Sequence, residues 1–303
     1  MTHNEFNAVI VTFNPNIENL YSLVNCLSNQ KVKTVFIVDN GSKNILDLQV
    51  FDGAVSSTTK LELILLNGNY GIAKAQNVAI DLALQRNLSY LIFFDQDSAI
   101  PEDFINNLMQ DYKEIESQGI NVGLIGPRFI DSRYNFFYKT IDYSSGHRKK
   151  LDVSNITTPM RSTLLISSGS MASLDAIKKV GLMREAYFID YVDTEWCFRF
   201  ESLGYENFIS SRAVMKHAVG DSIIEFKFFN TPIHSPFRRY FVTRNAFYMF
   251  KEAHIPKIVP TRQIFVNLIQ QIIILLHSKN KISYIKAFFK GIKDGVQYLV
   301  KKG

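Results

Sequence analysis

The 303-residue chain contains only two cysteines, Cys26 and Cys197, and both fall in segments with the apolar spacing of amphipathic helices. So few cysteines exclude a disulfide-stapled secreted domain, and we expect two free, buried thiols in a reducing compartment. The first residues lack the basic and apolar regions of a signal peptide. No stretch of about 18 uninterrupted apolar residues occurs, which argues against a membrane-spanning helix. We therefore expect a cytoplasmic protein.

Two glycine-rich phosphate-binding patterns are also missing: neither Gly-x-Gly-x-x-Gly nor Gly-x-x-x-x-Gly-Lys occurs. Their absence excludes the usual fingerprints of a dinucleotide site and of a P-loop.

An acidic excess is lacking as well, because the net charge is +6 and residues 279–303 hold seven lysines against one acid, Asp294. A basic tail indicates either nucleic acid or an anionic membrane surface as a partner. No nucleic-acid-binding motif accompanies the charge, so we expect no nucleic acid partner.

Hydrophobic residues make up 47% of the chain and charged residues 20%, which is the balance of a folded globular protein. Apolar runs typical of buried strands alternate with amphipathic stretches. The predicted strands are 8–13, 34–38, 61–66, 90–94 and 121–126. Helices are predicted from Asn16, which can cap the first one, over about 72–85, and from Pro101. This alternation predicts an α/β fold with a largely parallel sheet and helices on both faces.

The second half of the chain has a less regular pattern. Residues 131–160 are polar and punctuated, which predicts long loops or a hairpin excursion. The further expected elements are a helix that ends near Gly181, a helix over 193–203, and strands near 206–210 and 213–217. Beyond Asp221 the pattern predicts three helical stretches with little strand signal, and we place a soft domain boundary near residue 230.

Two carboxylates, Asp95 and Asp97, directly follow the strand predicted over 90–94. In parallel sheets, ligands bind at the carboxyl ends of the strands. Neighbouring carboxylates repel each other, and a divalent cation removes that repulsion while it neutralises a diphosphate. The alternative is that both acids only cap a helix and solvate a loop, since aspartate is common in loops.

Two further segments end strands in the same way. Residues 39–42 (Asp-Asn-Gly-Ser) end the second strand, and residues 67–71 (Asn-Gly-Asn-Tyr-Gly) end the third and open a helix. Their amides, carboxylate and helix N-terminus could contact a base, a ribose and a phosphate. Each segment could equally be an ordinary turn.

Taken together, these segments resemble the successive nucleotide-binding motifs of family 2 glycosyltransferases with the GT-A fold. The stretches that carry this resemblance are 8–14, 38–42, 67–77 and 93–98, followed by 188–199 and 216–222, which resemble the family's catalytic-base and late histidine motifs. The forms Asp-Gln-Asp-Ser and Asp-Tyr-Val-Asp-Thr-Glu-Trp-Cys resemble the bacterial rhamnosyltransferase branch. The resemblance implies a GT-A catalytic domain over 1–230, with a nucleotide-sugar half to about 125 and an acceptor half from about 126, and a C-terminal helical region over 231–303.

The resemblance also implies a role for individual residues. Asp95, Asp97 and His217 would bind Mg²⁺ or Mn²⁺, with Asp97 as the principal ligand. Asp193 would be the general base that takes the proton of the acceptor hydroxyl. The residues that would contact the nucleotide sugar are Thr12, Asn14, Asp39, Asn40, Asn67, Gly71, Lys74, Asp95 and Gln96. Those that would contact the acceptor are Gly169, Ser170, Asp190, Glu195 and Trp196.

Alternatives to these roles stay open at this level. Many family members carry an acid where this chain has Val192, so the base could instead be Asp190 or Glu195. Asp193 could also be the N-cap of its helix. His217 could be a core histidine that closes a strand.

The implied activity is inverting transfer of L-rhamnose from dTDP-L-rhamnose to an undecaprenyl-diphosphate-linked glycan, for O-antigen or another surface polysaccharide. Attack on the sugar opposite the leaving dTDP would invert the anomeric centre, and the metal would stabilise the charge of the diphosphate. Another donor, such as UDP-galactofuranose or UDP-glucose, is the first alternative. A non-catalytic module that binds a nucleotide sugar or a membrane is the second, although the acids at 95, 97 and 193 argue against it.

The predicted C-terminal helices are amphipathic and basic. Residues 263–276 are mostly apolar, but Asn267, Gln270 and Gln271 interrupt them, so we expect this helix to lie on a bilayer rather than span it. From Lys281 onward, apolar residues recur at helical spacing with lysines between them, as in an interfacial helix on anionic lipid. Packing on the catalytic domain or at a homodimer interface predicts the same pattern. A lipid-linked acceptor favours peripheral contact with the inner face of the cell membrane.

Overall fold

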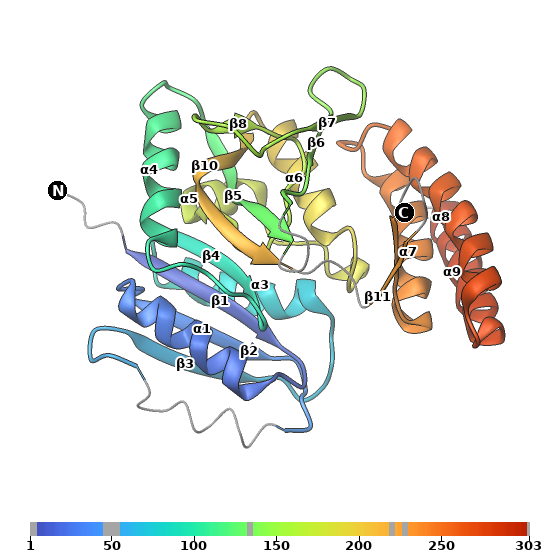
Figure 1. The fold of residues 1–303 in the computed structure, drawn as a ribbon, viewed down its shortest axis with the longest axis horizontal. Coiled ribbons are helices and arrows are strands. Elements are labelled where there is room, and N and C mark those ends of the chain that lie inside the picture. Colours follow the sequence, from blue (N-terminus) through green and yellow to red (C-terminus); the bar gives the residue numbers. More distant parts are fainter. Residues whose placement is uncertain (1–4, 45–54, 132–135, 218–221, 226–229, 302–303) are drawn as a thin grey trace.

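The computed structural model describes residues 5–44, 55–131, 136–217, 222–225 and 230–301 (Figure 1). A central sheet of eight strands forms the body of the molecule, in the order β3-β2-β1-β4-β9-β5-β10-β8. Its strands are β1 (Phe6–Thr12), β2 (Thr34–Asp39), β3 (Lys60–Leu65), β4 (Tyr90–Asp95), β5 (Val122–Asp131), β8 (Met160–Arg161), β9 (Met171–Ser173) and β10 (Glu206–His217). This architecture confirms the predicted α/β fold with a mostly parallel sheet.

The strands β3, β2, β1 and β4 are neighbours and run parallel. Their apolar runs are buried in β1, β2 and β4, as strands covered on both faces require. The register pairs Thr12 with Asp39 and Val11 with Asp95. The carboxyl ends of three neighbouring strands therefore meet at one edge of the sheet, and the predicted nucleotide residues lie there.

Helices cover both faces of the sheet. On one face, α1 (Ile17–Asn29) and α4 (Phe104–Glu116) share a buried apolar cluster with β1, β2 and β4. On the other face, α3 (Ile72–Gln85), α5 (Leu174–Val180) and α6 (Val192–Ser202) share a second cluster. Asn16 caps α1 as predicted, because its side chain accepts a hydrogen bond from the Asn19 amide at 3.0 Å. The predicted start of α4 at Pro101 is wrong, since residues 101–103 form a turn before the helix.

The second half of the sheet mixes directions. β9 lies antiparallel between β4 and β5, β10 runs parallel to β5, and β8 closes the edge antiparallel to β10. The two strands predicted near 206–210 and 213–217 are one strand with a shift of register between Ile209 and Val214. At this irregularity the buried carboxylate of Asp111 accepts hydrogen bonds from the Ser210 hydroxyl and the Ser211 amide, at 2.6 and 2.7 Å.

The excursion predicted over 131–160 contains a hairpin of β6 (Thr140–Asp142) and β7 (Lys149–Leu151), which confirms that expectation. A second hairpin, β11 (Ser222–Glu225) with β12 (Asn230–Ile233), was not predicted. Short 3₁₀ turns, η2 (Glu185–Tyr187) and η3 (Met249–Lys251), complete the regular elements.

The predicted three C-terminal helices are α7 (Pro236–Tyr248), α8 (Ile258–His277) and α9 (Lys281–Val300). They form a layer beside the α/β body, at the orange and red end of Figure 1, and α7 is the helix of this layer that contacts the body at η2. α7 and α9 approach closely at two glycines: a Cβ at Gly291 would lie 2.8 Å from the Tyr240 carbonyl, and one at Gly295 would lie 2.7 Å from the Phe247 ring. The C-terminal layer is therefore packed against itself along α7.

Candidate functional site

The carboxylate of Asp39 is the centre of a bonded group at the ends of β1 and β2. It accepts hydrogen bonds from the Thr12 hydroxyl at 2.8 Å and from the Ser42 amide at 2.8 Å, and the Ser42 hydroxyl also donates to it. Thr12 and Asp39 are fully buried. Asn14 joins the group because its amide donates to the Ser42 hydroxyl at 2.7 Å. The structure thus brings these predicted nucleotide residues together, and Ser42 covers the carboxylate from outside.

The segment 67–71 folds back onto Asn40. The Asn40 side chain donates to the Asn69 side chain at 3.1 Å and accepts from the Tyr70 amide at 2.9 Å. Two residues here must be glycine: a Cβ on Gly41 would lie 2.6 Å from the Gly68 backbone, and one on Gly71 would lie 2.5 Å from the Phe188 carbonyl. Both have positive φ, 82° and 88°. Asn40 and Gly71 are therefore part of a close-packed wall, not of an isolated turn.

Two other predicted nucleotide residues bond within the protein in this structure. The Lys74 ammonium lies 3.1 Å from the Glu185 carboxylate, and the Tyr70 hydroxyl donates to the Asn67 side chain. Gln96 ties the end of β4 to the loop after β1, because its side chain accepts from the Phe13 amide at 2.7 Å. A donor phosphate near Lys74 would compete with Glu185 for the ammonium.

The predicted metal ligands lie at the carboxyl end of β4. Asp95 is the last residue of the strand and is half-buried, whereas Asp97 is exposed. The Ser168 hydroxyl lies at the same edge of the sheet. It accepts a hydrogen bond from the Asp95 amide at 3.2 Å and lies 3.0 Å from the Ser98 hydroxyl. His217 ends β10 beside Asp131 of β5, and its side chain lies outside the described residues. Two hard oxygen donors at a strand end fit a divalent cation such as Mg²⁺ or Mn²⁺.

Asp193 lies in the first turn of α6 and is half-buried. Burial is the main reason that its pKa is raised to about 6, and the negative charges of Asp190 and Asp95 raise it further. The Thr194 amide donates to its carboxylate at 2.8 Å and opposes the rise. The N-cap of the helix is Tyr191, so the alternative that Asp193 serves as the cap is wrong. The structure therefore brings Asp193 within electrostatic reach of Asp95.

Two predicted acceptor residues, Gly169 and Ser170, are buried at the centre of the sheet. The Gly169 amide donates to the Phe93 carbonyl at 2.6 Å, and the Ser170 carbonyl accepts from the Phe93 amide at 3.0 Å. A Cβ on Gly169 would lie 2.9 Å from both Met215 and Pro127. These two residues join β4 to β9 in this structure, and their contact with an acceptor stays a prediction.

Glu195 and Trp196 are also enclosed by the protein in this structure. Trp196 is buried, its indole donates to the Gly181 carbonyl at 2.9 Å, and its ring meets Phe93 edge-on at 5.7 Å. Glu195 is also buried, and both of its carboxylate oxygens accept from the Arg199 guanidinium, at 2.9 and 2.6 Å. Bonds from His254 and Arg199 lower the pKa of Glu195 against its burial. These residues hold α6 in the core and leave Asp193 and Asp190 as the candidate bases.

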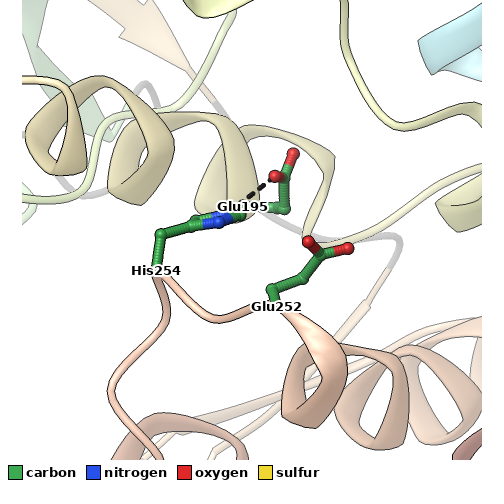
Figure 2. A group of neighbouring side chains, drawn as sticks. All are labelled: Glu195, Glu252 and His254. Carbon is green, nitrogen blue, oxygen red and sulfur yellow. Dashed lines mark hydrogen bonds and ion pairs between the residues drawn. The ribbon is translucent and has the colours of Figure 1, made fainter.

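Figure 2 shows Glu195 with Glu252 and His254 from the segment between α7 and α8. In the part of the chain that the structure describes, these are the three metal-ligating side chains whose ligand atoms lie within 4.8 Å of one another. The His254 Nε2 lies 2.8 Å from Glu195, and the Arg184 guanidinium lies 3.3 Å from Glu252. Since Arg184 and Arg199 already supply positive charge here, the group is an ion-pair network that ties the C-terminal layer to α6.

The residues of α7 that contact the segment before Asp193 were not predicted from the sequence. Arg238 pairs with the Asp190 carboxylate at 2.8 Å, and the buried Asn245 donates to three backbone carbonyls of this segment. The signal was the basic run over 236–245, which carries three arginines and no acid. Its partners lie about fifty residues earlier in the chain, so spacing gave no sign of them.

Comparison with known proteins places these contacts in a family context. The model of the family described as glycosyl transferase family 2 matches residues 8–169. The dTDP-rhamnosyl transferase RfbF of Shigella flexneri is 39% identical to this chain over 297 residues, which cover 98% of this chain and 97% of RfbF.

Solved structures with the same fold include S. aureus TarS (residues 1–349) in complex with UDP-GlcNAc, with 16% identity and a TM-score of 0.54 over 98% of this chain and 84% of that one. GalNAc-T7 with UDP, GalNAc and Mn²⁺ has 14% identity and a TM-score of 0.54 over 72% of this chain. The match covers 46% of the GalNAc-T7 chain, under half its length. These likenesses confirm the predicted GT-A fold.

Proposed function

Because the chain belongs to glycosyl transferase family 2, we propose that it transfers L-rhamnose from dTDP-L-rhamnose to a hydroxyl of a lipid-linked glycan, in the synthesis of a surface polysaccharide. The near full-length relative that is named a dTDP-rhamnosyl transferase supports this donor. The observation that carries the reaction is the position of Asp193, a carboxylate with a raised pKa that faces the acidic end of β4.

Asp193 acts as the general base. A sugar hydroxyl is a weak nucleophile until a carboxylate within hydrogen-bond reach takes its proton as the new bond forms. Burial and the neighbouring charge of Asp190 make the ionised Asp193 a stronger proton acceptor than an exposed aspartate. The acceptor oxygen then attacks the anomeric carbon from the side opposite the dTDP, so the anomeric configuration inverts.

Asp95 and Asp97 would hold a divalent cation, and their carboxylate oxygens and position at a strand end fit one. When bound, the cation supplies charge stabilisation for the departing diphosphate. The chain itself contributes the wall formed by Asp39, Asn40 and Gly71, which would orient the nucleotide. We propose that the acceptor approaches from the side of Asp190.

The test is turnover of dTDP-L-rhamnose with a lipid-linked glycan acceptor, with Mg²⁺ or Mn²⁺ and after chelation by EDTA. We expect release of dTDP that requires the metal and is lost in Asp97→Ala and Asp193→Asn. Full activity in EDTA would remove the metal from the proposal. A thermal-shift panel with dTDP- and UDP-sugars tests the donor, because the true donor stabilises the folded state most. A response to UDP-galactofuranose or UDP-glucose alone would replace dTDP-L-rhamnose.

We propose further that the C-terminal layer rests on the inner face of the cell membrane. α8 is long and apolar enough to cross a bilayer by length and composition, but the Arg239 guanidinium is buried against its polar residues Asn267 and Gln271. A charge on that face favours a helix that lies in the interface. Large apolar side chains on α8 and α9 are exposed: Phe265 by 64%, Ile272 by 61%, Leu276 by 71% and Phe289 by 64%. The lysines of α9 would meet anionic headgroups.

Vesicle flotation tests this location. The wild-type chain should float with phosphatidylglycerol vesicles and stay behind with phosphatidylcholine vesicles. The variant Ile272→Glu/Phe289→Glu should lose flotation, whereas Leu203→Glu, at the C-cap of α6 where Leu203 is 53% exposed, should keep it. Equal flotation of the two variants would exclude this surface. A dimer in solution that dissociates in the double variant would assign it to a second copy instead.

A further inference from the structure

The backbone just before Asp193 adopts a conformation that needs outside support. Phe188, Asp190 and Tyr191 have φ values of 65°, 65° and 62°, in the left-handed region that side-chain-bearing residues rarely occupy. Such residues cost free energy and persist only where their surroundings fix them. Tyr191 is the N-cap of α6, so the path of these residues decides where the first turn of the helix, and with it Asp193, lies.

A single side chain on α7 bonds to most of this segment. The Nδ2 of Asn245 donates to the carbonyls of Tyr187, Ile189 and Asp190 at 2.8, 2.8 and 3.0 Å. Asn245 is fully buried. An amide carries two N–H groups, so the three carbonyls share two protons and converge on one point. The preceding residue of α7 adds to this, since the Arg244 guanidinium donates to the Ala186 and Tyr187 carbonyls at 2.6 and 3.1 Å.

The side chains of two of the strained residues, Phe188 and Asp190, are anchored on the same helix. Arg238 contacts the Asp190 carboxylate through Nε at 3.1 Å and Nη2 at 2.8 Å. The Phe188 ring stacks on Phe241, with centroids 4.6 Å apart and planes 8° apart. The backbone of the segment and the side chains of Phe188 and Asp190 are thus fixed from α7, whereas the Tyr191 hydroxyl accepts from Gln263 of α8 at 3.0 Å.

The segment also contacts the nucleotide side at Phe188, whose carbonyl and ring lie against Gly71. The Ile72 amide, at the start of α3, donates to the Phe188 carbonyl at 2.7 Å. A shift of the segment would therefore change the distance between Asp193 and the groups after β3. Because a displacement of about 1 Å at a reacting group can cost about 100-fold in rate, the precision of these contacts matters to catalysis.

We propose that Asn245 is a positioning residue for the transfer reaction: together with Arg238 and Arg244 it holds residues 187–191 so that Asp193 lies in reach of the acceptor hydroxyl. This inference rests on the role proposed above for Asp193. It assigns α7 to the active site, because the three side chains act on the backbone and on the Asp190 carboxylate just before Asp193.

The decisive variant is Asn245→Asp, which keeps the size of the side chain and replaces its N–H donors by acceptors. We expect kcat to fall about 100-fold while KM for the nucleotide sugar changes little, because the donor wall of Asp39 and Asn40 is untouched. Thr243→Val is the matched control: Thr243 is buried on the same helix but faces α9, near Gly291. It should keep the wild-type kcat per folded molecule.

Each outcome decides the inference. A kcat for Asn245→Asp that equals that of Thr243→Val overturns it, and so does a loss of kcat matched by an equal loss of donor affinity, which marks general damage. If Asn245→Asp does not fold, Arg238→Gln takes its place, because Arg238 is only half-buried; an unchanged kcat in that variant overturns the inference. Rates are compared on whichever nucleotide sugar the wild-type chain uses, so a wrong donor leaves the test intact. An active Asp193→Asn would instead refute the proposed base.

Discussion

The nucleotide end of the sheet and the segment that carries Asp193 are held by different kinds of contact. Thr12 and Asp39 are neighbours in the parallel register of β1 and β2, and their hydrogen bond follows from that register. The segment 187–191 has strained backbone and is fixed by side chains of α7, about fifty residues further along the chain. The first region is a product of local sheet geometry, and the second depends on how the C-terminal layer packs.

This difference predicts which step of the reaction a substitution in each region affects first. A change in α7, α9 or the network of Glu195 should affect the chemical step before it affects donor binding. A change at Asp97 or Ser42 should affect the donor first. The following predictions test this separation, in order of decreasing effect.

Asp193→Asn should lower kcat about 1000-fold, because a general base contributes about 10²- to 10⁴-fold. Donor binding, measured by thermal shift, should stay near the wild-type level. Asp97→Ala is the comparison from the other region, and it should weaken the donor-induced shift. If both variants lose donor binding to the same extent, the two regions do not act separately.

The same Asp193→Asn substitution should stabilise the fold. The raised pKa of about 6 means that the ionised carboxylate is disfavoured in the folded state at neutral pH. From about 1.4 kcal/mol per pKa unit and a rise from 3.8 to about 6, we expect the free energy of unfolding to rise by up to about 3 kcal/mol. Urea denaturation at neutral pH measures this, and a loss of stability would contradict the assignment of the pKa to burial.

Two bidentate arginine–carboxylate pairs offer a matched test of stability. Arg199–Glu195 in the base region has side chains 13% and 0% exposed, whereas Arg86–Glu62 at the nucleotide side has them 38% and 16% exposed. Arg199→Met should cost about 3 kcal/mol, because it leaves a buried carboxylate short of charge. Arg86→Met should cost under about 1 kcal/mol. Urea denaturation of both variants gives the comparison, and equal costs would show that burial does not separate the two pairs.

The sequence predicted the nucleotide region better than the base region, for a physical reason. A buried strand that ends in a polar residue places that residue at the carboxyl edge of a parallel sheet, so the positions of Asp39 and Asp95 could be inferred from short segments. Amphipathic spacing likewise predicted the helices of both faces, and the polar, punctuated composition of residues 131–160 predicted the hairpin excursion. The predicted start of α4 at Pro101 was wrong because proline favours the first turn of a helix and equally favours a turn outside one.

The base region could not be predicted in this way. Glu195 and Trp196 follow Asp193 on a helix, and only the packed structure shows that they face the core. The role of Asn245 depends on contacts across about fifty residues, which no local pattern encodes. The left-handed residues at 188, 190 and 191 are likewise imposed by tertiary contacts, since none of them is glycine.

The pH dependence of turnover should report the base region alone. Since Asp193 must be ionised to accept a proton and its pKa is about 6, kcat should fall about tenfold per unit below that pH. The stability contribution has the opposite sense: a raised folded-state pKa stabilises the fold fully below about pH 3.8, and this is lost as pH rises through about 6. Donor binding over the same range is the control. A kcat that stays level from pH 7 down to pH 5 would contradict Asp193 as the base.

Ser42→Ala should give a small and local effect. The Ser42 hydroxyl donates to Asp39 and accepts from the Asn14 amide at 2.7 Å, while the Ser42 amide keeps its own bond to Asp39 at 2.8 Å. Loss of the hydroxyl should lower the free energy of unfolding by about 1 kcal/mol, as for a typical hydrogen bond. Because Ser42 covers the buried carboxylate, the donor-induced thermal shift should change while kcat at saturating donor does not. A fall in kcat at saturating donor would mean that the nucleotide end also controls the base, and the two regions would have to be treated as one.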